Sequence, residues 1–390
     1  MAGLKNSIKI KEQPSYNIKE QWKYTNINNF RNIGIKQKSS FIIKGNNTKN
    51  ITITNNELIQ NNLTNTNISF KNIKSSIDNN IYNCKKFFNK IIPNNNNEFI
   101  IQNTENFNSG IHMHTKDNAK ISEPIFIKNI IKTNDKKEFL NCRYLFTFGK
   151  NVSAKIIFDD TNSSKNYLNT VIEIFVDTNS KIDFIIDSEK PETTEIINLA
   201  SNISNNSTLN SYHINLSGKL FKNNYFINLM EQNSTYNYNG INLLENDNHI
   251  DNYIEINHLN KHTISNTNQK NILKGKSKGV FYTKAIIYES GANSEAHQKN
   301  NNILLSQNAK IHSNPQLEIY NDDVKCSHGS TTGAIDIDSL FYLRSRGINL
   351  KEAKKILLSS FLNEIINPLD IIFYNNSINK KINKWLYNVN

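Results

Sequence analysis

The chain alternates short apolar runs with polar turns over most of its length. Between about residues 97 and 335, runs rich in Ile, Phe, Tyr and Val are separated by turns rich in Asn, Asp, Ser and Gly. This pattern predicts short β-strands, and no stretch of it shows a helical period. Clear examples lie at 99–102, 124–131, 155–158, 170–176, 181–186, 212–216, 225–229 and 253–258.

One short phrase recurs where a turn leads into a strand. It reads NAKI at 118–121, SAKI at 153–156, NSKI at 179–182 and NAKI again at 308–311. The spacing varies, so the repeat is degenerate. Two mainly β architectures fit the pattern, a large sandwich and a parallel β-helix (β-solenoid). A corner that successive coils reuse favours the solenoid.

The pattern becomes helical at residue 336. Asp336 or Asp338 can cap a helix that Gly347 ends, and Asn349 can cap a second helix that Pro368 ends. The second helix is expected to bury one apolar stripe, made of Ala353, Ile356, Leu357, Phe361, Leu362 and Ile365. We expect this helical hairpin to cover the open edge of the last coil, to dock a partner, or both.

The first 65 residues are the least regular part of the chain. A short helix within 15–30, with Trp22 on its buried side, and strands at 41–44 and 50–54 are expected there. The chain therefore divides into an N-terminal α/mixed region (1–65), a solenoid core (66–335) and a C-terminal helical region (336–390).

Composition narrows the functional classes. Of 390 residues 37% are hydrophobic, and the formal net charge is +12. Many Asn residues are expected in turns, where they tolerate left-handed geometry. The basic charge is weak evidence for nucleic-acid binding, because no zinc finger, RNP-like aromatic motif or basic zipper accompanies it.

The cysteines and the apolar runs indicate a compartment. Three Cys without a CxxC motif do not form a disulfide framework, which favours a reducing compartment such as a cytoplasm or a plastid-like organelle. No apolar run reaches the roughly 20 residues of a membrane span, and no signal-peptide core is visible, so no membrane partner is expected.

Cys326 and His328 are the leading candidates for chemistry. Apolar and polar residues alternate over 315–320, which predicts a half-buried strand, and the phrase DDVKCSHG follows at 322–329. Residues two apart on a strand share a face, so the thiol and the imidazole could bind one metal. A conventional iron–sulfur cluster needs about four ligands, so this chain could only share one or hold it transiently. The alternative is a buried Cys and a hydrogen-bonded His in a tight turn.

The other histidines are weaker candidates. His112 and His114 could share a metal, but no third ligand lies nearby in sequence, so we expect surface positions. His258 and His262 are four apart, a helical spacing within a strand-like stretch, and are not expected to converge. His297 and His312 are assigned to the solenoid.

Two other motifs do not support an enzyme. Gly275-Lys276-Ser277 lacks the earlier glycine and the following helix of a phosphate-binding loop, so no nucleotide site is expected in this chain. Asp322 and Asp323 suggest a carbohydrate-cleaving or carbohydrate-binding β-helix, which is the alternative function. Adjacent strand residues point to opposite faces, however, which does not suit a pair of catalytic carboxylates.

Several stretches together resemble the SufD branch of the SufB/SufD family of iron–sulfur cluster assembly proteins. They are EQWKYTNI at 20–27, YLNTVIEIFV at 167–176, the region of His258 to Asn266, SEAHQKNNNILLS at 294–306, and above all DDVKCSHG at 322–329 with LFYLRSRGI at 340–348. SufB-type chains carry an acidic Glu-His-Glu-Ala phrase where this chain has Cys-Ser-His-Gly. One departure is FYTK at 281–284, which lacks the glycine usual in the family.

This resemblance implies a right-handed parallel β-helix flanked by helices, and a non-enzymatic scaffold subunit. It implies pairing with SufB, and binding of the ATPase SufC, which would supply ATP hydrolysis, by the C-terminal helices. In the family, the His of the Lys-Cys-Ser-His-Gly motif lies at the SufB–SufD interface, and His328 occupies that position. His328, with Cys326, would therefore contact a transient iron–sulfur cluster shared with SufB.

Overall fold

The computed structural model describes residues 22–26, 50–54, 57–61, 67–93, 97–107, 110–130, 139–159 and 167–387. The strand expected at 41–44 lies outside these residues. The strand at 50–54 is confirmed as β1 (Asn50–Thr54), which pairs antiparallel with β2 (Glu57–Asn61). The helix expected around Trp22 is wrong over 22–26, because these residues form a turn and bends.

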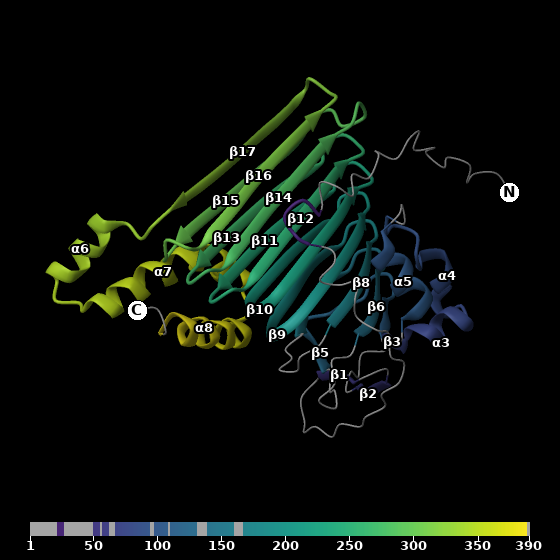
Figure 1. Ribbon diagram of the computed structural model, residues 1–390. Coiled ribbons are helices and arrows are strands. Elements are labelled where there is room, and N and C mark those ends of the chain that lie inside the picture. Colours follow the sequence, from purple (N-terminus) through teal and green to yellow (C-terminus); the bar gives the residue numbers. More distant parts are fainter. Residues whose placement is uncertain are drawn as a thin grey trace.

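The strands form a parallel β-solenoid with two walls, as predicted (Figure 1). The first wall contains, in spatial order, β1, β5 (Ile125–Ile130), β7 (Ser153–Asp159), the first part of β9 (Lys181–Ile203), the first part of β10 (Thr208–Leu229), β11 (Thr235–Leu244), β13 (Ile264–Leu273), β15 (Ser294–Leu304) and β17 (Val324–Gly333). The sandwich alternative is therefore wrong.

The second wall has the same parallel order, apart from its first strand. It contains β3 (Ile68–Asn72), which is antiparallel to β4, then β4 (Ile111–Thr115), β6 (Phe139–Phe148), β8 (Tyr167–Val176), the second parts of β9 and β10, β12 (His249–His258), β14 (Lys278–Ile287) and β16 (Lys310–Ile319). Apolar side chains between the walls, such as Phe146, Ile174 and Ile227, form the main core.

Three helices cover the outer face of the second wall at its early coils. They are α3 (Ile73–Asp78), α4 (Cys84–Phe87) after the short 3-10 turn η1 (Ile81–Asn83), and α5 (Glu98–Asn106). The strand predicted at 99–102 is wrong, because these residues belong to α5. Asn97 caps this helix by accepting hydrogen bonds from the N–H groups of Phe99 and Ile100. A short apolar run does not by itself distinguish a buried helix from a strand.

The C-terminal helices begin where the sequence predicts. Asp336 caps α6 (Ile337–Ser345), and Asn349 caps α7 (Leu350–Ile366) by accepting the N–H of Glu352 at 2.9 Å. The 3-10 turn η2 (Asn367–Leu369) leads into α8 (Ile372–Tyr387). The stripe predicted for α7 is partly wrong, because Ile356 is exposed and Leu358 is buried in its place.

These helices do not cover the end of the solenoid. The apolar faces of α7 and α8 pack on the outer face of the first wall, against Ile157, Ile185, Ile214, Ile241 and Ile272. These isoleucines come from β7 to β13, so the helices lie along a flank. The expectation that they cover the last coil is therefore wrong. In the pairings of the described strands, β16 pairs only with β14 and β17 only with β15, so each has a free edge.

A left-handed asparagine recurs at one corner of successive coils. Asn118, Asn151, Asn179, Asn206 and Asn233 have φ between 52° and 59°. Each of the last four donates a side-chain amide hydrogen bond to the previous Asn, at 2.8–3.2 Å. Asn adopts this backbone region more readily than other residues with a Cβ. This ladder accounts for part of the high Asn content.

Polar side chains are also buried between the walls. Asn215, Asn242, Asn271 and Asn302 form a second amide ladder. His258 is fully buried, and its two ring nitrogens lie 2.8 Å from the hydroxyls of Thr263 and Ser265. Burial lowers the pKa of His258 to about 3, so the ring is neutral in the folded chain at neutral pH. Its role is structural.

The corner ladder predicts unequal effects of two substitutions at Asn206. Position 206 has a left-handed backbone with φ 52°. Alanine has a Cβ but lacks the side-chain amide that helps asparagine to adopt this conformation, so Asn206→Ala should lower the free energy of unfolding by about 1–2 kcal/mol. Asn206→Gly loses the same ladder bonds but tolerates the backbone, so its loss should be smaller. Urea unfolding of both variants checks this. Equal losses would contradict the role of the left-handed backbone.

Burial of His258 predicts loss of stability in acid. Between pH 6.5 and pH 3 the unfolded chain binds a proton at this ring that the folded chain does not, so stability falls as pH falls through this window. At pH 4.5 the penalty is about 2–3 kcal/mol relative to pH 7. His258→Gln should remove about that much of the difference in unfolding free energy between pH 7 and pH 4.5. His262→Gln, at an exposed corner, is the control; equal pH dependence in both variants would contradict the assignment.

Candidate functional site

Cys326 and His328 lie on β17, the last strand of the first wall. The bend at Asp322 and Asp323 precedes this strand, and both carboxylates are exposed. In the parallel register Cys326 pairs with Ala296 and His328 with Gln298 of β15. The two candidate residues are two apart on a regular strand, so they share a face, as predicted.

That face is directed between the two walls. Cys326 packs in a small apolar cluster with Ala285 and Ile287 of β14, Ala296 of β15 and Leu317 of β16. Gln298, below His328 in the stack, is buried. Because no described strand continues the stack, Cys326 is half-buried and His328 is exposed. The site is therefore the uncovered interior of the last coil.

Gln298 forms the floor beneath His328. Its carbonyl oxygen accepts a hydrogen bond from the Thr283 hydroxyl at 2.6 Å, and its amide donates to the Gln316 carbonyl at 2.9 Å. These bonds cross from the first wall to β14 and β16 of the second. The floor therefore holds the two walls of the last coils at a defined separation.

The thiol is not activated by its surroundings. Burial raises the pKa of Cys326, and a hydrogen bond from the Ala296 backbone only partly opposes this effect. The thiol is therefore protonated at neutral pH, and binding of a soft metal would have to release its proton. Cys84 and Cys142 are buried elsewhere in the fold.

The backbone of the last coil is open to a further strand. Along a parallel strand, successive residues direct their N–H and C=O groups to opposite sides. The N–H of Glu295 donates to the carbonyl of Thr263, immediately before β13, so the peptide groups of the odd-numbered residues of β15 face β13 and those of the even-numbered residues face β17. On β17, the peptide groups of the odd-numbered residues face β15 and form hydrogen bonds with these groups. Cys326 and His328 thus present their peptide groups to the free edge.

The edge of β16 is interrupted. Lys310 donates to Ser277 and Tyr320 to Ile287, so even-numbered residues bond to β14 and odd-numbered residues face the free edge. Pro315 is one of these odd-numbered residues and has no N–H. A proline in a strand is tolerated at such a position.

His112 and His114 are not surface residues as a pair. His112 is buried, and both rings lie within 3.2 Å of the Thr147 hydroxyl. Tyr82 stacks on His114 with ring centroids 4.5 Å apart. Burial lowers the pKa of His112 to about 4. The surface expectation is therefore wrong for His112, whose surroundings come from three separate elements.

The remaining candidate residues do not converge on the site. His262 is exposed at a corner and does not meet buried His258. His297 contacts Ser327 on the outer side of β17 at 2.7 Å, and His312 stacks on Tyr24. Gly275 has φ 72° at a corner that leads into strand β14, which agrees with the rejection of a phosphate-binding loop.

The residues of the WKYT phrase belong to a network of contacts that the sequence does not predict. Thr25 is buried and donates to Asp251 at 2.5 Å, and Lys222 donates to the same carboxylate at 2.8 Å. Trp22 packs on Phe99 with ring centroids 5.4 Å apart. The segment is thereby attached to α5 and β12. The signals in the sequence were the resemblance to a family signature and the expected burial of Trp22, which packs against the cluster of Phe99 and Ile196.

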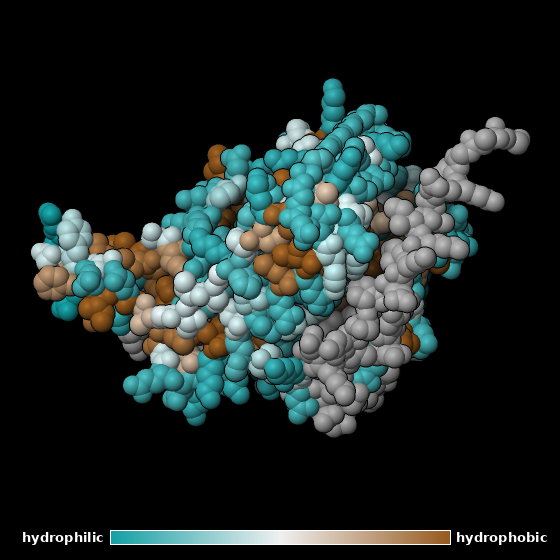
Figure 2. All heavy atoms as spheres, turned by 90° about the horizontal axis from the view of Figure 1, so that it is seen from above, coloured by the Kyte–Doolittle hydropathy of each residue, from teal (hydrophilic) through white to brown (hydrophobic). Residues whose placement is uncertain are grey.

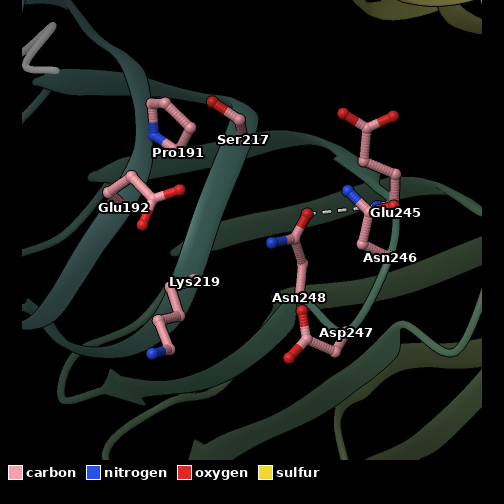
Figure 3. Close-up of a pocket in the computed structure, with 8 residues that line it drawn as sticks. All are labelled: Pro191, Glu192, Ser217, Lys219, Glu245, Asn246, Asp247 and Asn248. Carbon is pink, nitrogen blue, oxygen red and sulfur yellow. Dashed lines mark hydrogen bonds between the residues drawn. The ribbon is translucent and has the colours of Figure 1, made fainter.

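A polar pocket of about 260 Å³ lies at a coil corner (Figure 3). It is lined by Pro191, Glu192, Ser217, Lys219 and Glu245 to Asn248. Lys274 neutralises Glu245 at 2.9 Å. The pocket contains neither Cys326 nor His328 and is not part of the candidate site.

Across the described ranges, no group of three or more His, Cys, Asp or Glu side chains is arranged to hold a metal ion. Nor does any helix in the described part of the chain have the length and apolar character needed to cross a membrane. Among the described residues, no third side chain of these types joins Cys326 and His328 in such a group.

Comparisons with known proteins identify the family. Residues 130–361 match the family model for the SUF system FeS cluster assembly, SufBD core domain. The iron–sulfur cluster assembly protein SufD of Escherichia coli is 27% identical over 265 residues, which is 68% of this chain and 56% of that protein. An iron–sulfur cluster assembly SufBD family protein of Synechocystis is 28% identical over 214 residues, 54% of this chain and 47% of that protein.

A third relative is more distant. SufD of Plasmodium berghei is 25% identical over 308 residues, 73% of this chain but 22% of that protein. The chain spans about half the length of the first two relatives. The family match covers more than half of the chain and includes the coils that carry Cys326 and His328. The chain belongs to the SufBD family of the SUF system for iron–sulfur cluster assembly.

Proposed function

We propose that this chain is a SufD-type scaffold subunit that helps to assemble iron–sulfur clusters. In this proposal it pairs with SufB through the open end of its solenoid and binds the ATPase SufC through its C-terminal helices. His328, with Cys326, lies at the assembly interface. The observation that carries the proposal is the uncovered last coil, in which both residues line the open interior.

The number of ligands supports a shared cluster. A thiolate and an imidazole both suit iron, but a cluster needs about four ligands. A partner strand beside β17 would meet the peptide groups of Cys326 and His328 and bring its own side chains to the same opening. Iron and sulfide are therefore cargo of a joint site, and the chain contributes positioning rather than catalysis.

The C-terminal helices support a second docking surface. Ile337 and Phe341 of α6 are 76% and 73% exposed, and Tyr342 is 56% exposed. Figure 2 shows apolar residues gathered at the end of the molecule that carries α6 and the start of α7. Such a patch marks an interaction site. We assign SufC to it, and ATP hydrolysis to SufC.

The first test is anaerobic co-expression of this chain with its cognate SufB and SufC, followed by purification and assay of iron and sulfide. A stable three-component complex with cluster is the expected result. His328→Ala should leave the complex intact but reduce cluster by about tenfold or more, because a ligand-position side chain is lost. His297→Ala, on the outer face of the adjacent strand, is the matched control.

Two outcomes would reject parts of this proposal. If the wild-type chain elutes alone in the presence of both partners, the scaffold function is wrong. If the complex forms and His328→Ala yields normal cluster, the role of His328 is wrong.

The second test concerns the α6 patch. Phe341→Ser should weaken SufC binding by about tenfold or more, since burying a Phe side chain contributes roughly 1.5–3 kcal/mol. The chain should remain folded, because this side chain is largely exposed. Ile372→Ser, which alters an equally exposed apolar residue on α8, is the control. Isothermal titration calorimetry of both variants with SufC decides the matter; equal affinities would place the docking surface elsewhere.

A further inference from the structure

Helix α7 is attached to two neighbouring strands by one carboxylate. Glu364 forms a short ion pair with Lys270 of β13, and its other oxygen lies 3.1 Å from the ammonium of Lys299 on β15. Lys270 also donates to the carbonyl of Phe361 at 2.7 Å, and its ammonium lies 4.5 Å from the centre of the Phe361 ring. We call Glu364, Lys270 and Lys299 the α7 clamp.

The clamp is close to the candidate site along the strands. Lys299 follows Gln298, and in the β15–β17 register Gln298 pairs with His328 and Lys299 with Gly329. Gln298 is in turn held by Thr283. A displacement of β15 at Lys299 therefore acts one residue away from the floor beneath His328.

The clamp resists slipping because Lys270 is buried. Only 5% of its side chain is exposed, whereas half of the Glu364 side chain is. If α7 moved without β13, the ammonium would lose the Glu364 carboxylate, the Phe361 carbonyl and the Phe361 ring together, because all three belong to α7. For a small displacement that leaves the ammonium covered, the result is an uncompensated buried charge, which is strongly unfavourable. Motion of α7 is therefore passed to β13 and, through Lys299, to β15.

Other ion pairs attach the same helical region to earlier coils. Lys381 of α8 pairs with Asp187 of β9 at 2.9 Å, and Lys155 of β7 lies 4.0 Å from Asp370. Neither involves β13, β15 or β17. Within the described residues, these two ion pairs hold the helical region to early coils, whereas the α7 clamp holds it to strands beside the last coil.

We propose that Glu364 is a positioning residue that couples movement of α6 and α7 to the strand floor beneath His328. This inference rests on the proposed function, in which the ATPase SufC binds α6, and it takes ATP binding to SufC as the event that displaces α6 and α7. Glu364 then determines whether that displacement reaches β15 and β17 or is absorbed on the flank.

The test uses hydrogen–deuterium exchange of the full chain, with Glu364→Gln compared with wild type. Gln retains the size of the side chain but removes the charge that the two lysines share. Lys381→Met, which breaks the anchor to β9, is the matched control. In the free chain, Glu364→Gln should increase exchange in 294–304 and 324–333, and Lys381→Met should not.

The second arm uses the three-component complex with and without a non-hydrolysable ATP analogue. In the wild type and in Lys381→Met, the analogue should change exchange in 294–304 and 324–333. Glu364→Gln should bind both partners with unchanged affinity but lose most of that change. An undiminished change in Glu364→Gln would overturn the coupling. If the wild-type chain binds no partner, the proposed function fails first, and the coupling fails with it even if the free-chain arm succeeds.

Discussion

In-register stacking of parallel coils is the constraint on which the rest of the structure depends. From β4 onward, each paired residue lies over its counterpart 26 to 33 positions away, so like side chains form continuous rows. An asparagine amide both donates and accepts, and a row of asparagines therefore satisfies itself. Because the hydrogen bonds of the row are satisfied, polar side chains can be buried between the two walls, and the chain forms a core although only 37% of its residues are hydrophobic. Val, Ile and Phe fill the rest of the interior, and the corner asparagines supply the left-handed turns.

The same stacking leaves the last coil of the solenoid without a neighbour on one side. A row of side chains is complete only while another coil follows, and the last coil leaves its interior face and its peptide groups open. The C-terminal helices do not remedy this, because the apolar outer surface that attracts them runs along the flank from β7 to β13. The fold therefore presents two separate surfaces. One is the open end that carries Cys326 and His328, and the other is helix α6 with its exposed apolar side chains. The α7 clamp lies between them.

Much of this could be predicted from the sequence, because it depends on local patterns. Strand period, the caps at Asp336 and Asn349, and the shared face of Cys326 and His328 follow from neighbouring residues alone. The predictions that were wrong concern features that depend on residues distant in the sequence. The four-residue run in α5 is ambiguous without the surface it packs on, and the burial of His112 depends on Thr147. The flank position of α7 follows from isoleucines on five coils. The family resemblance drew attention to His328, whose place in an open interior only the fold reveals.

Pro315 has a consequence for assembly of the free chain. A contact between two different surfaces of one protein produces a ring if its rotation closes and a filament if it does not, and an exposed parallel edge is a ready template for such growth. With its amide donor absent in mid-strand, β16 is a poor template for indefinite end-to-end stacking, whereas the donor row of β17 continues past His328. The solenoid can thus remain open for one partner strand and still be protected from polymerisation with its own copies.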